Sequence, residues 1–407
     1  MVRVSGPAAG DALRTLTGGL TEPRKAAARV LRGGDGVELD RALVLWLPGP
    51  GTATGEDVAE LHLHGGRAVV AAVERTLAAL QGLRAATPGE FTRRAFANRR
   101  IDLAQAEGLA ELLEAETELQ RRSAMAMAGG ALSRKAEDWR DAVLALSAEV
   151  EGVLDFADEE DAADLPPSFA GRAGKLVAEL QEWLHRPRAS ILREGYRIVL
   201  AGPPNAGKST LFNALLENEA AITSPTAGTT RDVLERSVAM AGIPFTLVDT
   251  AGLRDGERDE IETIGIARAR EQLARADLVL WLGEEGAGPP DAWEIDAKSD
   301  DPARQAKSHD ALALSAKTGF HVGLLRERLI EHARKAMPVP GEVALTEHQS
   351  RLLKEAHDAL LGIHAHIDPL LAAEHLRLAR SAFDRLVGRA STEDMLDALF
   401  GRFCIGK

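Results

Sequence analysis

The 407-residue chain has little of several features that would constrain its biology. It contains one cysteine, Cys404, so no intramolecular disulfide can form, which fits a reducing compartment. Aromatic residues make up 4% of the chain, and no run of 18 or more apolar residues occurs, so no membrane span is predicted. The N-terminal stretch lacks the charged, apolar and cleavage regions of a signal peptide. These absences together predict a cytoplasmic protein.

Basic residues are outnumbered by acidic ones. The chain has 49 Lys and Arg against 62 Asp and Glu, which gives a net charge of -13 at pH 7. This balance argues against a general nucleic-acid coat, but it does not exclude a local basic site for one RNA. A hydrophobic content of 45% is sufficient for a buried core, and about 150 residues per domain predicts two or three domains.

Hydrophobic patterning divides the chain into four segments. Residues 1–98 carry short β-like runs and one helical stretch, which predicts an α+β domain. Residues 99–192 and 337–407 are helical in spacing, whereas residues 193–336 alternate strands and helices. The pattern predicts a multidomain α/β and α+β protein in which an α/β domain is inserted between two halves of a helical domain.

The stretch YRIVLAGPPNAGKST predicts a buried strand followed by a phosphate-binding loop. Gly202 is followed after four residues by Gly207, Lys208 and Ser209, which is the spacing of the phosphate-loop motif. The glycines let backbone N–H groups approach the phosphates, Lys208 reaches the β- and γ-oxygens, and the Ser209 hydroxyl ligates Mg²⁺. The motif therefore predicts that this segment binds a nucleoside triphosphate.

Three further motifs follow in the order expected of a GTPase. TAGTTRD (226–232) offers Thr230 as a second Mg²⁺ ligand, and FTLVDTAGLR (245–254) brings Asp249 to the end of a strand. LSAKTG (314–319) is a strand-end loop that presents a backbone N–H to a guanine oxygen. Each motif alone is compatible with an ordinary turn, but their order predicts a P-loop GTPase domain.

Two positions depart from the usual GTPase pattern. Leu253 stands where Ras-like proteins place a glutamine that orients water, so another group must orient the nucleophile. The guanine-reading motif Asn-Lys-x-Asp is here AKSD (297–300), in which Asp300 still accepts both guanine N–H donors. Loss of the asparagine amide is expected to weaken the pocket by about 1 kcal/mol.

Six stretches are distinctive enough to compare with known families: TGEDVAELHLHGG, PGEFTRRAFANRRIDLAQAEG, AGPPNAGKSTLFNAL, AGTTRD, DTAGLR and the terminal FCIGK. Together, and in this order, they resemble the tRNA modification GTPase family MnmE, also called TrmE. The resemblance implies an N-terminal folate-binding α+β domain that forms a homodimer, a helical domain, and an inserted Ras-like GTPase domain. It also implies a complex with the flavoprotein MnmG, as a heterotetramer or larger, and action on carbon 5 of the wobble uridine of tRNA.

The resemblance also implies cofactors. An aminomethyl-type group is built with a one-carbon unit from tetrahydrofolate, as the 5-formyl or 5,10-methylene derivative, while FAD and NADH enter only through MnmG. GTP is the substrate for hydrolysis, with Mg²⁺, and K⁺ at the interface of two GTPase domains takes the place of an arginine finger. The matching folate positions are Arg3, Glu60, Arg100 and Lys407. Cationic side chains suit the glutamyl carboxylates of folate, and a glutamate can accept from its pterin ring.

Roles in hydrolysis follow residue by residue from the same resemblance. Ser209 and Thr230 match the Mg²⁺ ligands, and Glu262 matches the group that orients water, acting with Lys208 as the catalytic residues. The K⁺ ligands are Asn205, Ser224, Thr226 and Thr229. The full set of predicted GTP-binding residues is Asn205, Ala206, Gly207, Lys208, Ser209, Thr210, Ser224, Thr226, Thr229, Thr230, Asp249, Thr250, Ala251, Gly252, Lys298, Asp300, Ser315, Ala316 and Lys317.

Several alternatives stay open for individual residues. Glu262 equally fits a solvated helix face. The arginines of TRRAFANRR, among them Arg93 and Arg94, fit a solvated loop or a tRNA phosphate contact as well as folate. His62 and His64 lie two apart on a strand, which suggests a metal, but they lack a third ligand.

The termini raise two questions. FCIGK fails the prenylation pattern at its last two positions, which leaves Cys404 either packed or a thiol that takes part in chemistry. Family members begin with a further strand before the segment VRVSG, so either the true start lies upstream of Met1, which is favoured, or the folate pocket and the dimer edge lack a strand.

A second function competes with tRNA modification. An Era-like GTPase that assists ribosome assembly would also carry these nucleotide motifs, but the C-terminal segment lacks the GxxG loop of a KH domain. The sequence does not indicate the nitrogen donor, glycine or ammonia, or the tRNAs served.

Overall fold

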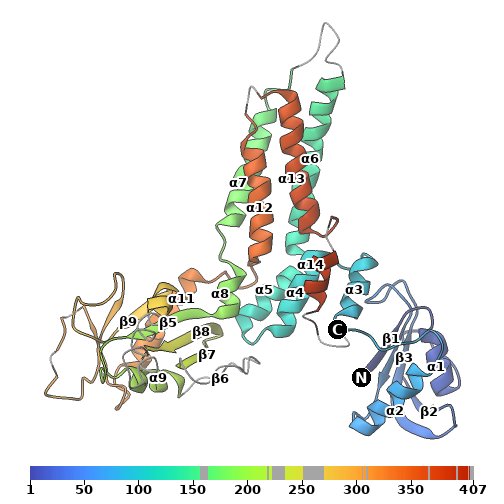
Figure 1. The fold of residues 1–407 in the computed structure, drawn as a ribbon, viewed down its shortest axis with the longest axis horizontal. Coiled ribbons are helices and arrows are strands. Elements are labelled where there is room, and N and C mark those ends of the chain that lie inside the picture. Colours follow the sequence, from blue (N-terminus) through green and yellow to red (C-terminus); the bar gives the residue numbers. More distant parts are fainter. Residues whose placement is uncertain are drawn as a thin grey trace, which may run out of the picture. The chain divides into compact units, whose positions relative to one another are not determined.

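The computed structural model describes residues 1–155, 164–217, 220–221, 234–250, 270–304, 306–308, 310–364, 367–390, 393–401 and 403. The chain divides into two compact units, each assembled from separate stretches of sequence. The first unit comprises Met1–Ala110, Met127–Gly174 and Asp358–Lys407, and the second comprises Glu111–Ala126 and Lys175–His357. Most of the elements are labelled in Figure 1.

The first unit opens with a four-stranded antiparallel sheet of order β1-β4-β3-β2. Its strands are β1 (Val2–Ser5), β2 (Ala27–Arg32), β3 (Glu38–Leu47) and β4 (Val58–His62). Helices α1 (Ala9–Thr17) and α2 (Arg67–Ala78) contribute to a core against one face, and Leu13, Val44 and Val73 are almost fully buried there. Residues 1–98 contain both strands and helices, as the sequence predicts.

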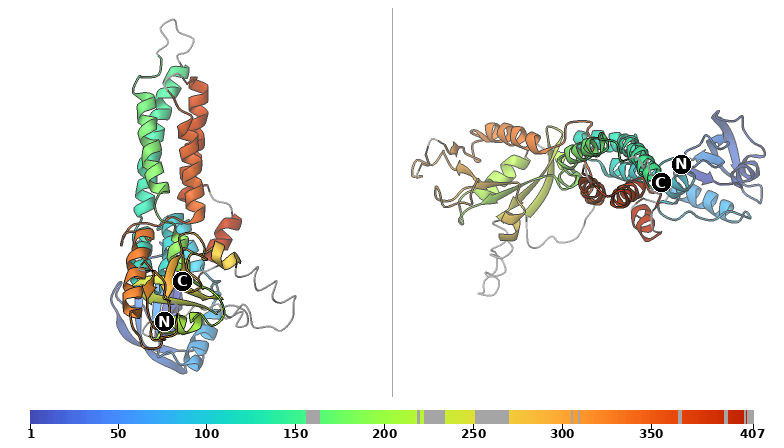
Figure 2. Two further views of the ribbon diagram at one scale, coloured as in Figure 1. Left: turned by 90° about the vertical axis from the view of Figure 1, so that its left-hand side faces the viewer. Right: turned by 90° about the horizontal axis from the view of Figure 1, so that it is seen from above.

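Helices form the rest of the first unit: α3 (Glu90–Ala97), α4 (Leu103–Glu114, up to Ala110), α6 (Ala131–Asp155), α13 (Pro369–Leu386) and α14 (Glu393–Phe400). Figures 1 and 2 show α6 and α13 running side by side, although they are far apart in sequence. The buried Trp139 stacks on Phe383 at 5.7 Å between ring centroids, and Arg140 pairs with Asp384 at 2.9 Å. A second apolar cluster joins α4 to α14 through Leu103, Leu399 and Phe400, among others.

The second unit is built around a seven-stranded sheet of order β11-β10-β9-β5-β8-β7-β6. The strands are β5 (Tyr196–Ala201), β6 (Ala220–Ala221), β7 (Leu234–Met240), β8 (Ile243–Asp249), β9 (Leu278–Trp281), β10 (Trp293–Asp296) and β11 (Leu312–Ala313). Strands β8, β5, β9, β10 and β11 are parallel, while β7 and β6 pair antiparallel. Its helices are α5 (Glu118–Ala128), α7 (Phe169–Leu184), α8 (Ala189–Glu194), α9 (Lys208–Leu216), α11 (Val322–Ala336) and α12 (Glu347–Leu361), with α5, α7 and α12 continuing into the first unit.

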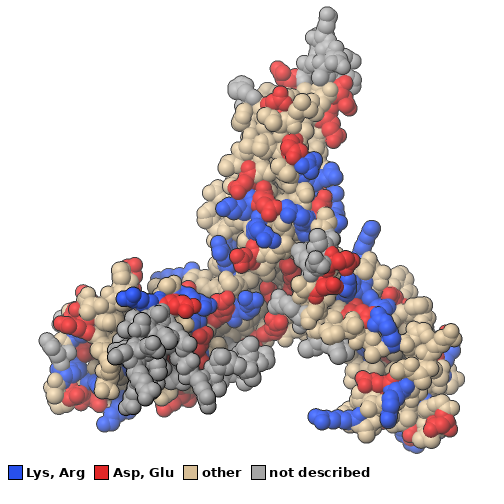
Figure 3. Space-filling view, in the orientation of Figure 1, with Lys and Arg blue, Asp and Glu red and all other residues tan. Residues whose placement is uncertain are grey.

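Every residue of β5 and β8 is buried, which is the burial expected of central parallel strands covered on both faces. The strand–loop–helix order predicted around YRIVLAGPPNAGKST is confirmed, because β5 ends at Ala201 and α9 begins at Lys208. Within the described residues, no helix has the length and apolar character needed to cross a membrane. Figure 3 shows side chains of both charge signs interspersed on the visible face, without an extended area of one sign.

Gly89 marks a close approach between two distant segments of the first unit. Its φ is +70°, and a Cβ added there would lie 2.0 Å from the Phe400 carbonyl oxygen of α14. Gly89→Ala is therefore expected to displace α14, in addition to a left-handed backbone cost of about 1–2 kcal/mol. Hydrogen exchange of peptides covering α14 should rise in the variant.

Gly152 in α6 provides the matched control for this substitution. A Cβ added there meets nothing within 4 Å, so Gly152→Ala should stabilise the helix by roughly 0.5–1 kcal/mol. Equal exchange of α14 in the two variants would contradict the proposed contact.

Candidate nucleotide-binding site

The phosphate loop spans Gly202–Gly207 between β5 and α9. Gly202 has φ +147°, and a Cβ there would lie 3.0 Å from the Gly283 nitrogen, so the position requires glycine for conformation and for space. Gly207, with φ +99°, is the N-cap of α9. The first N–H groups of α9 have no partner within the helix, so the loop forms the start of an anion site.

Lys208 is folded back over this loop. Its side chain is 5% exposed, and Nζ donates to the Gly202 and Pro203 carbonyl oxygens at 3.0 and 2.8 Å. A buried ammonium group needs such partners, because desolvation without them is costly. The predicted phosphate-binding lysine therefore lies at the loop, held by acceptors that phosphate oxygens can replace.

Ser209 and Asp249 meet at the ends of α9 and β8. The Ser209 hydroxyl donates to Asp249 Oδ2 at 2.6 Å, and Asp249 is fully buried. Thr250, the next residue, donates from its hydroxyl to the Leu200 carbonyl oxygen at 2.8 Å. A hydroxyl and a carboxylate side by side are the hard oxygen donors that Mg²⁺ prefers, so these residues fit the predicted ion.

The two predicted guanine segments are joined to each other. The Ser315 side chain lowers the pKa of Asp300 by a hydrogen bond, assisted by its own backbone and by nearby Lys317 and Arg304. The Ser299 nitrogen also donates to the Leu314 carbonyl oxygen at 3.0 Å. An ionised Asp300 is the form that accepts from guanine, so this link favours the predicted role.

Lys298 connects the base segment to the phosphate loop. Its Nζ donates to the Asn205 carbonyl oxygen at 2.6 Å. Ala297, at the position of the missing asparagine, lies beside the loop, with its Cβ 3.8 Å from a Cβ added at Gly207. Among the other predicted residues, Ala206 and Ala316 pack on the core of this unit, and Thr210 is exposed on α9.

Other predicted residues lie outside the described part of the chain. These are Ser224, Thr226, Thr229, Thr230, Ala251, Gly252, Glu262, Cys404 and Lys407.

The predicted folate residues lie in the first unit. Arg3 of β1 is directly opposite Glu60 of β4, and its guanidinium lies 4.0 Å from the centre of the Phe91 ring. Arg100 follows α3, and its side chain lies against the backbone of Gly55. The structure therefore places Arg3 opposite Glu60 in the sheet and Arg100 at the neighbouring loop.

That loop, residues 49–57, is held by contacts that sequence reasoning missed. Thr54 Oγ1 lies 2.7 Å from Ser5 Oγ, and the Asn98 amide donates to the Thr54 carbonyl oxygen at 2.7 Å. Arg94 pairs with Glu56 at 3.0 Å and with Glu90 at 2.8 Å. The run PGEFTRR indicates that Arg94 is available for an ion pair. Its partner Glu56 lies too far away in the sequence to be identified from this run.

The other basic residue of this run is also paired. Arg93 forms ion pairs with Glu393 and, at 2.7 Å, with Asp397 of α14. Arg93 and Arg94 therefore lie on helix α3 and not in a loop, and both pair with carboxylates while staying partly exposed. His62 and His64 likewise contact Glu60 and Asp40, and no metal-binding group of three such residues occurs in the described ranges.

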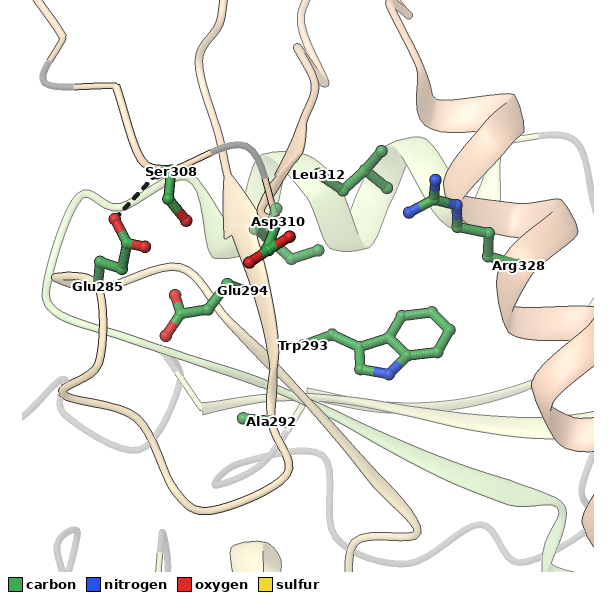
Figure 4. A pocket seen from close by; sticks show the side chains of 9 residues that line it. Glu285, Ala292, Trp293, Glu294, Ser308, Asp310, Leu312 and Arg328 are labelled. Carbon is green, nitrogen blue, oxygen red and sulfur yellow. Dashed lines mark hydrogen bonds between the residues drawn. The ribbon is translucent and has the colours of Figure 1, made fainter.

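A cavity of about 380 Å³ lies in the second unit, at the β11 edge of its sheet, beside β10, β11 and α11 (Figure 4). Trp293, Leu312 and Arg328 line one part, and the Glu285 carboxylate accepts from the Ser308 nitrogen at 2.9 Å. None of the lining residues belongs to the phosphate loop, so this cavity is not the nucleotide site.

Comparison with known proteins covers the whole chain. A family model described as "GTP-binding protein TrmE N-terminus" matches residues 1–100, and one described as "MnmE helical domain" matches residues 103–404. The chain is 62% identical over 407 residues to "tRNA modification GTPase MnmE" of Erythrobacter litoralis, covering 100% of this chain and 96% of that protein. It is 60% identical over 419 residues to the protein of that name from Novosphingobium aromaticivorans, with 100% and 96% covered.

The Arg84 guanidinium, followed by the Thr87 nitrogen and Arg94, lowers the pKa of Glu90 to about 2. A carboxyl group with a lowered pKa stabilises the fold above its unfolded pKa near 4.5, and this stabilisation is lost as pH falls towards 2. Glu90→Gln is therefore expected to loosen α3 at neutral pH, and the difference from the wild type should shrink below pH 4.5. Hydrogen exchange of α3, compared between the two proteins at each pH, measures this difference.

Glu374→Gln is the control, because Glu374 pairs only with Arg377 among described side chains in an exposed i,i+3 pair on α13. Exposed pairs of this kind contribute little, so its effect should be small at every pH. If the difference in α3 exchange between Glu90→Gln and the wild type stayed constant from pH 7 to pH 3, ionised Glu90 would not be the source of this stabilisation.

Proposed function

The chain belongs to the MnmE family of tRNA modification GTPases, and from this premise we propose that it uses GTP hydrolysis to drive modification of the wobble uridine of tRNA. It is a GTP-hydrolysing enzyme. The observation that carries the proposal is the phosphate loop with Lys208 folded over it and Ser209 against Asp249, in a chain that matches the family along its whole length.

The phosphate loop would hold the triphosphate with its backbone N–H groups. Lys208 exchanges its loop carbonyl partners for phosphate oxygens and neutralises charge that develops during hydrolysis. Ser209 and Thr230 would hold Mg²⁺, with the Asp249 carboxylate behind Ser209, and the ion would supply positive charge to the phosphates. Since Leu253 cannot polarise water, Glu262 is the proposed group that orients the nucleophile.

Asp300 would select guanine. Its carboxylate accepts from the two N–H donors of the base, an arrangement that adenine cannot match, and the Ser315 hydrogen bond keeps it ionised. Lys298, tied to the Asn205 carbonyl oxygen, supports the phosphate loop from the base side. With Ala297 in place of asparagine, this single link fastens the base segment to the loop among the contacts described.

The N-terminal domain would bind a tetrahydrofolate derivative. Arg3, Glu60 and the Phe91 ring place a cation, a carboxylate and an aromatic face together, a combination that suits a charged heteroaromatic ligand. Arg100 and Lys407 would add positive charge for its carboxylates. The folate derivative supplies the one-carbon unit, and the flavoprotein MnmG, working with a homodimer of this chain, supplies the redox chemistry.

Hydrolysis should depend on K⁺. With Asn205 of the phosphate loop as a proposed ligand, the ion would add the positive charge that an arginine finger supplies in other GTPases. The GTPase kcat is expected to be at least about tenfold higher in KCl than in NaCl at equal ionic strength, within the range that one transition-state charge contributes. Asn205→Ala should remove the preference for K⁺ while GTP still binds. Equal rates in the two salts would count against this mechanism.

A deletion strain tests the tRNA assignment. Mass spectrometry of its tRNA nucleosides is expected to show loss of the modification on carbon 5 of the wobble uridine. The wild-type gene should restore it, whereas Lys208→Ala should not, because that variant cannot hold the triphosphate. Unchanged wobble uridines would reject tRNA modification and favour the ribosome-assembly alternative, which ribosome profiles of the same strain would reveal.

A further inference from the structure

Two linkers attach the GTPase fold to the helical segments. The inbound linker is residues 185–195, and the outbound linker is residues 337–346. They are bonded to each other, because the Ala189 nitrogen donates to the Leu345 carbonyl oxygen at 2.9 Å. Arg186 also pairs with Glu342 at 3.3 Å and lies over the Trp183 ring. The linkers thus form one joined structure instead of two independent tethers.

Helix α5 is fastened to both linkers, although it precedes them by many residues. Gln120 forms a capping box with Thr117, in which its Oε1 accepts from the Thr117 nitrogen at 2.8 Å. The other end of the same amide, Nε2, donates to the Leu192 carbonyl oxygen of the inbound linker at 2.8 Å. One side chain therefore both starts the helix and holds it to the linker.

Ser123 makes the contact with the outbound linker. Its side chain is 4% exposed, and Oγ donates to the Glu342 carbonyl oxygen at 2.9 Å and accepts from the Ala344 nitrogen at 3.3 Å. Loss of this hydroxyl would leave two backbone groups of a buried segment without that partner, which would weaken the attachment.

The start of α5 also contacts the turn between β7 and β8. The Leu119 nitrogen donates to the Gly242 carbonyl oxygen at 3.4 Å, and the Leu119 side chain belongs to the same core as Met240 and Ile243. The far end of β8 is Asp249, about 20 Å away for seven residues in extended conformation. β7 begins directly after the segment that carries the AGTTRD motif. The hairpin therefore connects α5 in the chain to both segments that are proposed to contact the nucleotide phosphates.

The other end of α5 lies in the first unit. Met127 and Ala128 lie so close to Gly108 of α4 that a Cβ added there would be 2.5 Å from the Ala128 nitrogen. Residues Glu111–Ala126 belong to the second unit, whereas Met127–Gly174 belong to the first. Helix α5, like α7 and α12, thus has residues in both units.

We propose that α5 moves as a rigid part of the GTPase fold and conveys its nucleotide-dependent movement to the helical domain, with Gln120 and Ser123 as positioning residues. Loose linkers would absorb such movement at the insertion point, but here both linkers are bonded to each other and to α5. Movement is therefore passed along the helix to Gly108. This inference deepens the proposed function, because it names how hydrolysis is coupled to the rest of the protein.

Distances between paired spin labels in the full chain test the rigid attachment without disturbing it. In a Cys404→Ser background, one pair joins Arg122→Cys on α5 to Glu331→Cys on α11, and a second joins Arg122→Cys to Arg377→Cys on α13. Labelled chain is diluted with unlabelled chain, and GDP is compared with GDP and aluminium fluoride. The first distance should stay the same, whereas the second should change. A change in the first distance, or none in the second, would overturn the proposal.

Gln120→Glu combined with Ser123→Ala tests the two positioning residues. Glutamate keeps the oxygen that caps α5 but removes the donor to the Leu192 carbonyl oxygen, so helix start and attachment are separated. The GTPase kcat and KM of the double variant should stay within about twofold of the wild type. Modification of tRNA should fall more than about tenfold, since coupling between sites commonly amounts to about 5- to 150-fold.

Ser147→Ala is the matched control, because its hydroxyl also donates to one backbone carbonyl oxygen, that of Val143, but within α6. It should leave both activities unchanged. Normal tRNA modification by the double variant would reject the role of Gln120 and Ser123, as would a parallel fall in GTPase activity, which indicates a structural defect. If tRNA modification proved independent of this protein, the label distances alone would still decide whether α5 moves with the GTPase fold.

Discussion

The backbone hydrogen bond from the Ala189 nitrogen to the Leu345 carbonyl oxygen closes the inserted GTPase fold at its base. The entropic cost of bringing two chain positions together grows only slowly with the length between them, so an insertion of this size is tolerated once its ends meet. This hydrogen bond brings the end of the insertion back beside its beginning. Segments that precede and follow the insertion can then share a core, as Trp139 of α6 and Phe383 of α13 do.

The nucleotide site likewise depends on a few specific contacts. Lys208 and Asp249 are buried charges, and each has partners within the phosphate loop and its neighbouring strand. Buried charges without partners would destabilise the fold, so the protein keeps them paired with groups that bound phosphate and metal can replace. The arrangement is therefore both stable and prepared for its ligand. In the N-terminal domain, Arg94 pairs with Glu56 and Glu90 and so holds the loop beside Arg3 and Glu60.

Much of this site is predictable because its parts are local in sequence. The phosphate loop needs a strand, a few loop residues and a helix start in immediate succession, and YRIVLAGPPNAGKST contains all three. The strand before Asp249 and the loop at Ser315 follow from similar short patterns. Glu262, Thr230 and Lys407 lie outside the described residues, so their roles stay predictions.

Pairings across long sequence separations are not predictable in this way. Neither Arg94 with Glu56 nor Gln120 with Leu192 is visible in any short pattern, because one partner gives no indication of where the other will lie. The basic run TRRAFANRR was consequently interpreted as solvated or ligand-binding, whereas Arg93 and Arg94 are held by carboxylates. Gln120 illustrates the difference, since its capping role belongs to the local motif TELQ, but its link to the inbound linker does not.

By itself, the sequence determined the elements, their order and the nucleotide motifs, because hydrophobic period, turn residues and loop spacing act over a few neighbouring residues. Only the tertiary structure decided which charges are paired, which helix holds the linkers, and that the start of α5 contacts the β7–β8 turn. These contacts depend on where the packed elements bring distant residues, and packing is a property of the whole chain.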